Sequence, residues 1–414
     1  MELKPGYKMT EAGVIPEDWM SFELGKYGNL QKQVITPSSY PNQIFYEYSM
    51  PAFDDGEKPA KIYGKEIHSN KTKITGEVIL FNKLNVRQRR VWLVNNASNN
   101  TICSTEFLSY KTKKVTLNLL KQILLTDKVT IYFENKSTGT SNSQKRITPN
   151  TFLEFKCCVP QSLTEQQAIA AALSDVDELL SSLDQLIAKK KDIRLAAMQE
   201  LLTGKIRLPG FGGSWSRKRL EELAEINPEN LSASTPSNYE FNYIALEDVS
   251  KGHLLKFSHY SFADSPVRAR RIIKPKDILV STVRPNLKSH LLATDNENNW
   301  ICSTGFCIVR CHKNLVEPTY VYHSLFTDDI EYQIKLIVTG SNYPAINSSD
   351  VTNLKIYLPS SLAEQQAIAS VLSDMDAEIE ALEARRDKVR HIKAGMMQEL
   401  LTGKTRLISS GERA

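Results

Sequence analysis

The sequence has few cysteines and no long apolar run, and these two shortages exclude several classes of protein. Its six cysteines in 414 residues form no Cys-x-x-Cys pair, so a disulfide framework is not expected. No apolar run approaches the ~20 residues that a bilayer-spanning helix requires. The first ten residues carry lysines and a proline but no apolar core, unlike a signal peptide. We therefore expect a protein of the cytoplasm with no membrane segment.

Metal-binding and nucleophilic motifs are also scarce. Cys302, Cys307, Cys311 and His312 are of the residue types that bind zinc, but their spacing favours reduced cysteines in half-buried strands. The seven histidines are scattered singly, and none stands near a nucleophile in the sequence. We therefore expect no metal site and no catalytic residue in this chain.

Motifs for cofactor-dependent chemistry are missing too. The chain has no Pro-Pro pair and so lacks the Asn/Asp-Pro-Pro-aromatic loop with which amino-methyltransferases hold a flipped base. It has no P-loop, and Gly210-Phe-Gly-Gly213 precedes no predicted helix of a βαβ unit. Asp127 with Glu134 and Lys136 faintly resembles a nuclease signature, but the gap is short and Gln333 stands 199 residues after Glu134. A fused methyltransferase or nuclease with an unrecognised catalytic set stays as the alternative.

The charge that is present is distributed unevenly. Residues 1–160 hold 22 Lys and Arg against 15 Asp and Glu, whereas residues 209–358 hold 16 of each. A phosphate-binding surface needs locally clustered cations rather than a high total. The net charge of +5 therefore decides little by itself.

A long internal repeat organises the chain. Residues 163–208 and 362–407 match without a gap at an offset of 199. A chain of 414 residues is also too long for one ordinary core. The repeat therefore predicts the order domain, helix, domain, helix.

Each copy of the repeat is predicted to be one helix of about 40 residues, about 60 Å long. Ser-x-x-Glu capping boxes at residues 162–165 and 361–364 begin the two helices. Gly204 and Gly403 stand where a left-handed C-cap residue belongs. Both ends of both helices are therefore defined by the sequence.

Between these ends the apolar residues alternate in steps of four and three, which is typical of a coiled-coil stripe that packs on a partner helix. A coiled coil between two chains would satisfy such stripes, but two related helices in one chain can also pack on each other. We predict the second arrangement, with the two helices packed on each other in a pseudo-two-fold chain. The predicted stripes consist of Ile169, Leu173, Val176, Leu180, Leu183, Ile187, Ile368, Leu372, Met375, Ile379 and Leu382.

The segments between the helices repeat more faintly. Ile102-Cys-Ser-Thr105 recurs as Ile301-Cys-Ser-Thr304, again at an offset of 199. Short β-rich runs and a helical stretch at 319–327 indicate the α+β class, with two similar α/β domains joined by the helices. Strands are predicted at residues 77–81, 129–133, 277–281, 306–310 and 354–358. The predicted boundaries are 1–160 for the first domain, 161–208 for the first helix, 209–358 for the second domain, and 359–414 for the second helix and tail.

Both helices begin and end with the same short motifs. They begin with Leu163-Thr-Glu-Gln-Gln-Ala-Ile-Ala and Leu362-Ala-Glu-Gln-Gln-Ala-Ile-Ala, and they end with Met198-Gln-Glu-Leu-Leu-Thr-Gly-Lys205 and Met397-Gln-Glu-Leu-Leu-Thr-Gly-Lys404. With these motifs and the alternation of variable domains and repeated helices, the chain resembles a specificity subunit of type I restriction–modification systems along essentially its whole length.

The resemblance implies that each domain is a target-recognition domain for one half of a bipartite, asymmetric double-stranded DNA target. The helices would pack antiparallel and act as a spacer that sets the gap between the half-sites. The resemblance also implies two adenine-methyltransferase subunits and restriction–translocase subunits as partners. S-adenosylmethionine, ATP and magnesium would be used by those partners, so this chain is expected to be non-catalytic and without a cofactor of its own.

Basic clusters follow equivalent strands of the two domains. Most such residues contact phosphates, and few read bases. Because arginine suits guanine and asparagine suits adenine in the major groove, the candidates for base reading are Asn85, Arg87, Arg284 and Asn286. The other candidate DNA contacts are Lys83, Arg89, Arg90, Lys111, Lys113, Lys114, Arg268, Arg270, Arg271, Lys274 and Lys288, with Ser141, Asn142, Asn342 and Tyr343 in a second pair of loops that faces DNA or forms only turns.

A basic cluster has a less specific interpretation, because a single one is more often a solvated face. A coiled-coil scaffold with no nucleic-acid role is accordingly the second alternative. Two clusters in corresponding loops of a duplicated domain favour DNA binding.

Overall fold

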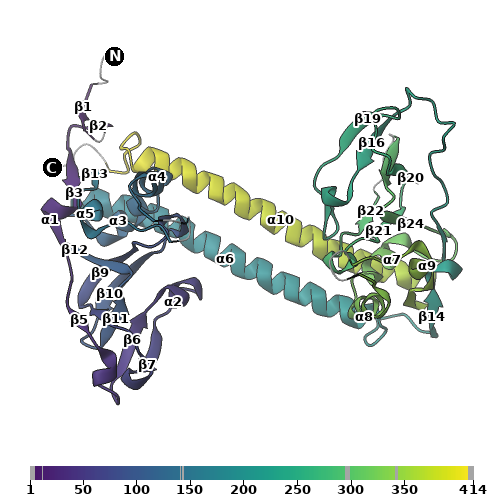
Figure 1. Ribbon diagram of the computed structural model, residues 1–414, viewed down its shortest axis with the longest axis horizontal. Helices are drawn as coiled ribbons and strands as arrows, with labels where there is room; N and C mark the ends of the chain where they lie inside the picture. The colour runs from purple at the N-terminus through teal and green to yellow at the C-terminus, as the bar shows by residue number, and fades with distance from the viewer. Residues whose placement is uncertain are drawn as a thin grey trace. The chain divides into compact units, whose positions relative to one another are not determined.

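Each copy of the repeat forms one continuous helix of 39 residues, α6 (Leu163–Leu201) and α10 (Leu362–Leu400). The computed structural model describes residues 5–11, 13–139, 141, 144–293, 299–340 and 344–408. Helices and strands are mixed along the chain (Figure 1). The predicted α+β class is therefore confirmed.

The chain divides into two compact units, and each unit contains half of both long helices. Unit 1 comprises residues 1–183 and 385–414, and unit 2 comprises residues 184–384. This division runs through the middle of α6 and α10. The predicted boundaries after residues 160, 208 and 358 separate the globular domains from the helices, so they describe a different division from that into units. These boundaries stay a prediction.

A serine caps the start of each long helix, but the predicted capping box is only half formed. The Oγ of Ser162 accepts a hydrogen bond from the N–H of Glu165 at 3.5 Å, and the Oγ of Ser361 accepts one from Glu364 at 3.4 Å. The two glutamate carboxylates are bound by arginines instead. The predicted role of these carboxylates in capping is therefore wrong, because a cation from a distant part of the chain takes them.

An arginine just after each long helix binds the glutamate near the start of the other. In unit 2 the Nη2 of Arg207 lies 2.6 Å from Glu364 Oε2. In unit 1 the Nη2 of Arg406 lies 2.7 Å from Glu165 Oε2 and 2.6 Å from Asp18 Oδ2. Glu165 and Glu364 are 1% and 0% exposed. These two contacts, which we call the arginine clasps, are related by the same offset of 199.

The turn after each long helix contains the predicted glycine. Gly204 and Gly403 have φ values of +71° and +72°, as a left-handed C-cap residue requires. A Cβ atom on Gly204 would lie 3.0 Å from the ring of Trp215, and one on Gly403 would lie 2.5 Å from Pro16. Close packing therefore adds to the backbone requirement for glycine.

Within each unit the two helix halves run antiparallel. In unit 2 the Nζ of Lys190 lies 2.7 Å from Glu378, and the Nε of Arg194 lies 2.8 Å from Asp376. Rising residue numbers on α6 thus meet falling numbers on α10.

The first two positions of each predicted stripe pack into a globular core that also contains residues from the end of the other long helix, Leu400 in unit 1 and Met198 and Leu201 in unit 2. Ile169 and Leu173 belong to the main core of unit 1, and Ile368 and Leu372 belong to that of unit 2; all four are 0% exposed. The long helices are thus anchored in the globular parts at their starts. Of the other stripe residues, Leu183, Ile187 and Ile379 are buried, and Val176, Leu180, Met375 and Leu382 are half-buried.

The globular part of unit 1 holds two main sheets, with the orders β10-β9-β12-β4 and β5-β8-β11-β6-β7. Strands β6 and β11 are parallel, and the other neighbours in these sheets are antiparallel. The strands are β1 (Tyr7–Thr10), β2 (Gly13–Pro16), β3 (Trp19–Glu23), β4 (Gly28–Leu30), β5 (Val34–Ile35), β6 (Ile44–Tyr48), β7 (Ala60–Tyr63), β8 (Lys71–Lys73), β9 (Gly76–Asn82), β10 (Val91–Ala97), β11 (Thr101–Ser104), β12 (Phe107–Thr112) and β13 (Lys156–Pro160). The short helices are α1 (Leu24–Tyr27), α2 (Met50–Asp54), α3 (Leu117–Leu124), α4 (Asp127–Asn135) and α5 (Pro149–Leu153).

Unit 2 contains two corresponding sheets, with the orders β15-β24-β21-β22 and β19-β16-β23-β20. Strands β16 and β23 are parallel, as β6 and β11 are in unit 1. The strands are β14 (Trp215–Arg219), β15 (Ala224–Ile226), β16 (Glu240–Ile244), β17 (Val249–Ser250), β18 (His253–Leu254), β19 (Ser258–Ser261), β20 (Ala269–Ile273), β21 (Ile278–Ser281), β22 (Leu291–Leu292), β23 (Trp300–Ser303), β24 (Phe306–Cys311) and β25 (Lys355–Pro359). The short helices are α7 (Pro318–Ser324), α8 (Asp328–Ile337) and α9 (Ser348–Asn353).

The central strands of the two units share one register. Tyr110 of β12 faces Ile79 of β9, and Val309 of β24 faces Ile278 of β21. Both facing pairs are related by 199 residues. The faint repeat in the variable segments therefore corresponds to a repeated sheet.

After these strands the offset between the units becomes 201. Thr126 precedes α4 and Thr327 precedes α8, so two residues have been inserted in unit 2. The counterpart of Glu134 is therefore Lys335, and the pairing with Gln333 predicted from a constant offset is wrong.

The run at 129–133, predicted as a strand, lies in helix α4. Its β-branched and aromatic residues favour a strand locally, but Val129 and Phe133 lie one helical turn apart and are 3% and 0% exposed. The ring of Phe133 packs on those of Phe81 and Phe152, with centroids 5.1 and 5.9 Å away. Packing of one apolar face thus overrides local propensity. The other four predicted strands coincide with β9, β21, β24 and β25.

The cysteines are free thiols, and most of them are buried. Burial raises the pKa of Cys307 to about 11 and that of Cys311 to about 12, so these thiols stay uncharged. Within the described residues, no group of three or more His, Cys, Asp or Glu is placed to hold a metal ion. In the same part of the chain, no helix combines the length and the apolar character that crossing a membrane requires.

Candidate DNA interface

The loop that follows β9 in unit 1 contains two of the predicted base readers. The 3-10 helix η3 (Val86–Gln88) lies between Asn85 and Arg89, whose φ values are +50° and +48°. Val86 is 7% exposed and joins the main core, whereas Arg87 is exposed. The loop is therefore fixed by its second residue and presents its third to solvent.

The loop that follows β21 in unit 2 has the same conformation. The 3-10 helix η6 (Pro285–Leu287) lies between Arg284 and Lys288, whose φ values are +49° and +52°. Pro285 is buried and Asn286 is exposed. We call residues 85–89 and 284–288 the left-handed loops; they share one backbone frame at an offset of 199.

A second loop, further along the chain, holds each left-handed loop in place. The N–H of Asn85 donates to the carbonyl oxygen of Lys145 at 2.8 Å, and the N–H of Arg284 donates to that of Pro344 at 2.7 Å. The two loop regions predicted for each domain are therefore side by side within each unit. Of the four residues predicted in the second pair of loops, Ser141 is exposed, and Asn142, Asn342 and Tyr343 lie outside the described residues.

The arginines of the first left-handed loop are bound to carboxylates of unit 1. The Nε of Arg87 donates to Glu134 of α4 at 2.6 Å, and Arg89 binds Asp127 at the start of the same helix. Asp127 and Glu134, which resemble part of a nuclease signature in the sequence, therefore act as counter-charges for this loop.

These ion pairs lie at the surface and can be exchanged. The side chains of Arg87 and Arg89 are 47% and 41% exposed, and exposed pairs contribute only about 0–1 kcal/mol each. A phosphate that approaches can therefore replace the carboxylate at little cost. Arg90 is more enclosed, at 16% exposed, and binds Asp54 with two hydrogen bonds.

In unit 2 the fifth residue of the left-handed loop is anchored in the same way. The Nζ of Lys288 lies 2.7 Å from Glu331 of α8. Arg268 is exposed, and its carbonyl oxygen accepts a hydrogen bond from the N–H of Thr304. The next residue after Thr304, Gly305, accepts a hydrogen bond from the hydroxyl of Thr282, which lies just before the left-handed loop. Arg268 therefore lies at the same end of unit 2 as this loop.

Three other predicted cations of unit 2 have partners within the fold. Lys274 binds Glu229, and the Nη1 of Arg271 donates to Asn230 Oδ1 at 2.9 Å. The guanidinium of Arg270 lies 4.9 Å from the ring centre of Phe262. These side chains brace the segment around residue 230, and their contact with DNA stays a prediction.

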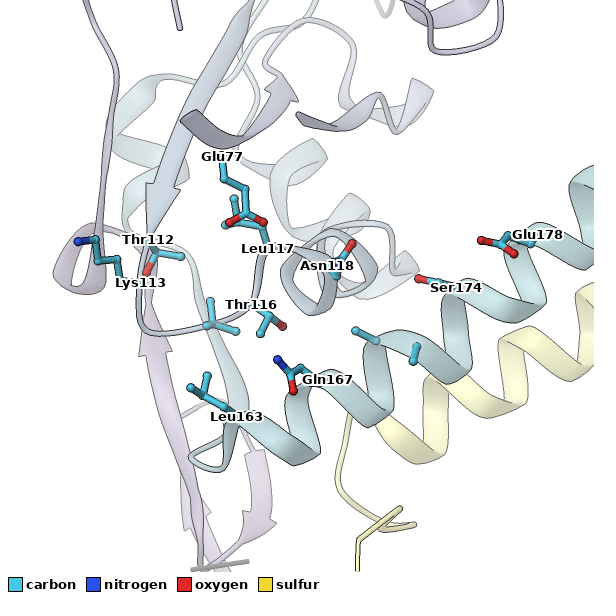
Figure 2. Close-up of a pocket in the computed structure, with 13 residues that line it drawn as sticks. Glu77, Thr112, Lys113, Thr116, Leu117, Asn118, Leu163, Gln167, Ser174 and Glu178 are labelled. Carbon is cyan, nitrogen blue, oxygen red and sulfur yellow. The ribbon is translucent and has the colours of Figure 1, made fainter. Parts of the chain in front are cut away.

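The cluster at Lys111, Lys113 and Lys114 lies away from the first left-handed loop. Phe107, at the start of β12, pairs with Asn82 beside that loop, and five residues of strand to Thr112 cover roughly 17 Å. Figure 2 shows Thr112 and Lys113 near the first turns of α6, at an open cavity of about 760 Å³. The lysines therefore do not join residues 83–90 in one surface.

A buried histidine supports the left-handed loop of unit 2. The Nδ1 of His290 accepts a hydrogen bond from the N–H of Ser281, the last residue of β21, at 3.1 Å. Burial, and to a smaller extent the charge of Lys288, lowers the pKa of His290 to about 4. The ring is therefore neutral near pH 7 and positions the strand end from which the loop begins.

A partly buried polar triad connects the globular part of each unit with the long helices. In unit 1 the Nε2 of Gln122 donates to Asp177 Oδ2 at 2.9 Å, and the Nζ of Lys393 lies 2.5 Å from Asp177 Oδ1. Gln122 lies in α3, Asp177 in α6 and Lys393 in α10. One carboxylate thus joins three helices.

In unit 2 the triad contains a histidine in place of the glutamine. The Nη2 of Arg194 donates to Asp376 Oδ2 at 2.9 Å and lies 3.4 Å from His323 Nδ1. Burial lowers the pKa of His323 to about 4, although Asp376 acts in the opposite direction. The Nε2 of His323 also lies 3.2 Å from the Oγ of Ser373. Both buried histidines of this part of the chain therefore have positioning roles.

Sequence reasoning missed His290 and Thr282 as supports of the site. A single histidine carries no pattern that marks it as buried, and the counterpart of Thr282 in unit 1 is Lys83, a residue of different chemistry. Only the three-dimensional contacts identify them.

The family model that matches this chain describes the type I restriction modification DNA specificity domain, and it covers residues 213–391. The matched segment includes the globular part of unit 2 with its left-handed loop. This part of the chain is therefore similar to a DNA specificity domain.

The relatives of the chain point to one family. The sequence is 25% identical to the type I restriction enzyme MjaVIII specificity subunit of Methanocaldococcus jannaschii, and the match covers 95% of this chain and 94% of the relative. In fold it is similar to the S subunit of a type I restriction–modification system from M. genitalium, with a TM-score of 0.58, 15% identity and coverage of 96% and 99%. A structure described as the basis of complex assembly and conformational transition of the type I R-M system is also similar, with a TM-score of 0.58, 20% identity and coverage of 94% and 99%. The resemblance predicted from the sequence is confirmed, since the matching family model, this relative and the S subunit of similar fold all carry the description of type I restriction–modification specificity proteins.

Proposed function

We propose that each unit of this specificity subunit reads one half of a bipartite, asymmetric double-stranded DNA target. The observation that carries the proposal is the pair of left-handed loops, which have one backbone frame and different side chains. A shared frame gives both units the same way of approaching a duplex. Different side chains give them different base preferences, so the two half-sites differ.

The charges of the loops suit this role. Arg89 and Lys288, the fifth residues of the two loops, are held by carboxylates of the following helices, and DNA binding exchanges these carboxylates for phosphates. Such contacts position the protein, whereas hydrogen bonds to base edges select the sequence.

The two long helices are the spacer in this proposal. The predicted domains at 1–160 and 209–358 are the target-recognition domains, and the antiparallel helices set their separation in a pseudo-two-fold arrangement. The antiparallel pairing within each unit and the two arginine clasps support this arrangement.

The chain itself is proposed to be non-catalytic and to act in the cytoplasm. Two adenine-methyltransferase subunits and restriction–translocase subunits bind to it. S-adenosylmethionine, ATP and magnesium are then used by those partners. The assembly named for one similar structure supports partner subunits in general.

The test of sequence reading is selection from a library of randomised DNA duplexes with the full chain. We expect two enriched half-sites of different sequence with a fixed gap. Lys288→Ala should lower the slope of log affinity against log salt by about 0.9, the effect of one phosphate contact. Lys114→Ala, at the other end of a sheet, is the matched control that should leave the slope unchanged. Unchanged slopes for both variants and no enriched sequence would favour the scaffold alternative.

The enzyme alternative has its own test. The purified chain is incubated with a labelled methyl donor and the selected duplex, with and without its methyltransferase partner. Methyl transfer is expected only with the partner, and transfer by the chain alone would disprove a non-catalytic subunit.

The spacer is tested by insertion of residues near 203–205. The gap between half-sites should change while each half-site sequence is kept. A change in the half-site sequences themselves would contradict the spacer model.

A further inference from the structure

The left-handed loops keep side chains where glycine would fit the backbone better. Among the described residues, eight residues other than glycine have φ in the left-handed region, and four of these are the first and fifth residues of the two loops. Left-handed backbone is unfavourable for residues with a Cβ atom, and glycine adopts it freely. Such positions persist where the surrounding structure holds them, and they cluster at functional sites.

The surroundings do hold these loops. The second residue of each, Val86 or Pro285, is buried, and the backbone N–H of the first residue is bonded to the neighbouring loop. The third and fourth residues are exposed in both units. Each loop is therefore a fixed frame that presents its polar side chains in defined directions.

The two loops carry asparagine and arginine in opposite order. The first and third residues are Asn85 and Arg87 in unit 1, but Arg284 and Asn286 in unit 2. Within the part of the chain that the structure describes, the amide groups of Asn85 and Asn286 make no hydrogen bond. Each unit therefore offers one unpaired amide to a ligand, at the first position of the loop in unit 1 and at the third position in unit 2.

We propose that the first and third side chains of each left-handed loop discriminate bases in a common frame, and that the transposition of asparagine and arginine makes the two half-sites differ. The proposal rests on the bipartite reading function and assigns it to these positions. Asparagine recognises adenine with two hydrogen bonds, and arginine recognises guanine in the same way. The two units then select adenine and guanine in opposite order at the positions under the loops.

The first experiment removes a side chain without straining the backbone. In Arg284→Gly the left-handed backbone is retained, because glycine adopts this φ freely. We expect an unfolding midpoint equal to or higher than that of the parent protein. In duplex selection, we expect the discrimination at one base of one half-site to fall by about 5- to 150-fold, the range for one bidentate contact.

The matched control is Lys276→Gly. Lys276 is also a cation with a left-handed φ, of +67°, in unit 2, but it lies outside the loop. This variant removes the same charge and relaxes the same kind of backbone strain. It should leave the discrimination at every base unchanged.

The second experiment transposes the side chains in unit 1. The double variant Asn85→Arg, Arg87→Asn keeps the composition and the net charge of the loop. We expect the half-site read by unit 1 to change its preference between adenine and guanine, and the other half-site to stay as in the parent protein.

The outcomes separate this inference from the proposed function. If the parent protein selects two half-sites, and the Arg284→Gly and transposed variants select the same sequences with the same discrimination, base reading by the loops is disproved and the bipartite function stands. If the parent protein selects no sequence, the proposed function fails. If both half-sites change in the transposed variant, independent reading by the two loops is disproved.

Discussion

Units 1 and 2 have the same strand register and place different side chains in it. Lys111 in β12 and Arg310 in β24 are equivalent at the offset of 199, and so are Val78 and Asp277, which stand just before the facing residues Ile79 and Ile278. In unit 2 Arg310 binds Asp277 with two hydrogen bonds, at 2.9 and 2.7 Å, whereas in unit 1 Val78 is part of an apolar cluster. Equivalent positions of the same sheet thus hold an ion pair in unit 2 and a member of an apolar cluster in unit 1. The two copies of the sheet keep the backbone and differ in their interior polar groups.

The polar triads give a second comparison. The carboxylates of Asp177 and Asp376 are bound by a cation of a long helix in both units, but the third member is Gln122 in one and His323 in the other. A glutamine does not titrate, and a histidine does. Protonation of the third member can therefore change the anchoring of the globular part to the long helices in unit 2, whereas the third member in unit 1 does not titrate.

The largest expected effect comes from breaking an arginine clasp. In Arg406→Ala the carboxylate of Glu165, which is 1% exposed, loses its buried partner, and a loss of about 3–5 kcal/mol in the free energy of unfolding is expected. Hydrogen exchange with mass spectrometry should show the loss of protection in unit 1 and little change in unit 2.

The mirror variant sharpens this test. Arg207→Ala should lower protection in unit 2 instead, because it leaves Glu364 unpaired. Equal loss in both units from either variant would contradict separate clasps. The double variant Arg406→Met, Glu165→Gln should recover most of the stability, since it removes the buried charge as well.

The next effect concerns the ion pair that only unit 2 contains. Arg310→Met should cost about 3 kcal/mol, because Asp277 is 1% exposed and would be left as an unpaired buried charge. The equivalent change in unit 1, Lys111→Met, leaves no such carboxylate unpaired, because Val78 occupies the position of Asp277. It should therefore change the free energy of unfolding by less than about 0.5 kcal/mol. Urea titrations of the two variants measure the difference, and equal costs would show that the comparison between the sheets is wrong.

A smaller effect should follow acidification. The pKa of His323 is about 4 in the folded chain, below the value of about 6.5 for an exposed histidine, so folding favours the neutral ring. The stability that this histidine contributes is fully present above pH 6.5 and is lost as the pH falls towards 4. At pH 5 the loss is about 2 kcal/mol.

The variant His323→Gln converts the triad of unit 2 into that of unit 1. It should remove part of the acid sensitivity of unit 2, measured as the change in unfolding midpoint between pH 7 and pH 5. His290 remains and has a pKa lowered to about 4 by burial, so some sensitivity persists. An unchanged pH dependence would show that His323 does not remain neutral in the folded state.

The smallest effect is expected at the glycines after the long helices. Gly204→Ala should cost about 1–2 kcal/mol, because φ is +71° and the new Cβ would lie 3.0 Å from Trp215. Gly403→Ala should cost somewhat more, since its Cβ would lie 2.5 Å from Pro16. Thermal unfolding measures both, and the reverse order would show that crowding of the new Cβ atom does not set the cost.

Much of the helical framework could be predicted from the sequence because its signals are local. The serines at 162 and 361 and the glycines at 204 and 403 define helix ends through contacts with residues a few positions away. The repeat at an offset of 199 then predicts that the two halves have one fold. The capping glutamates are the exception, because the arginines that bind them lie 157 and 241 residues away in the sequence.

The candidate site was predictable only as a region. The basic residues near 83–90 and 268–288 are visible in the sequence, and the pairing of Arg87 with Glu134 is not, since it depends on α4, where the sequence favours a strand. The left-handed φ at Asn85 and Arg284 also leaves no signal in the sequence, because no glycine marks it. The separation of Lys111–Lys114 from the loop requires the strand register.

The clasp of unit 1 has a consequence for the order in which the protein can be completed during synthesis. Glu165 is made long before Arg406, which lies 241 positions further along the chain. At about 5–20 residues per second, this interval lasts roughly 10–50 s. During this interval Glu165 has no arginine partner, and the main core of unit 1 lacks Leu400, because the end of α10 has not yet been synthesised. Unit 2 has all of its own clasp once Glu364 is made, so the half of the protein that is translated first is the half that is finished last.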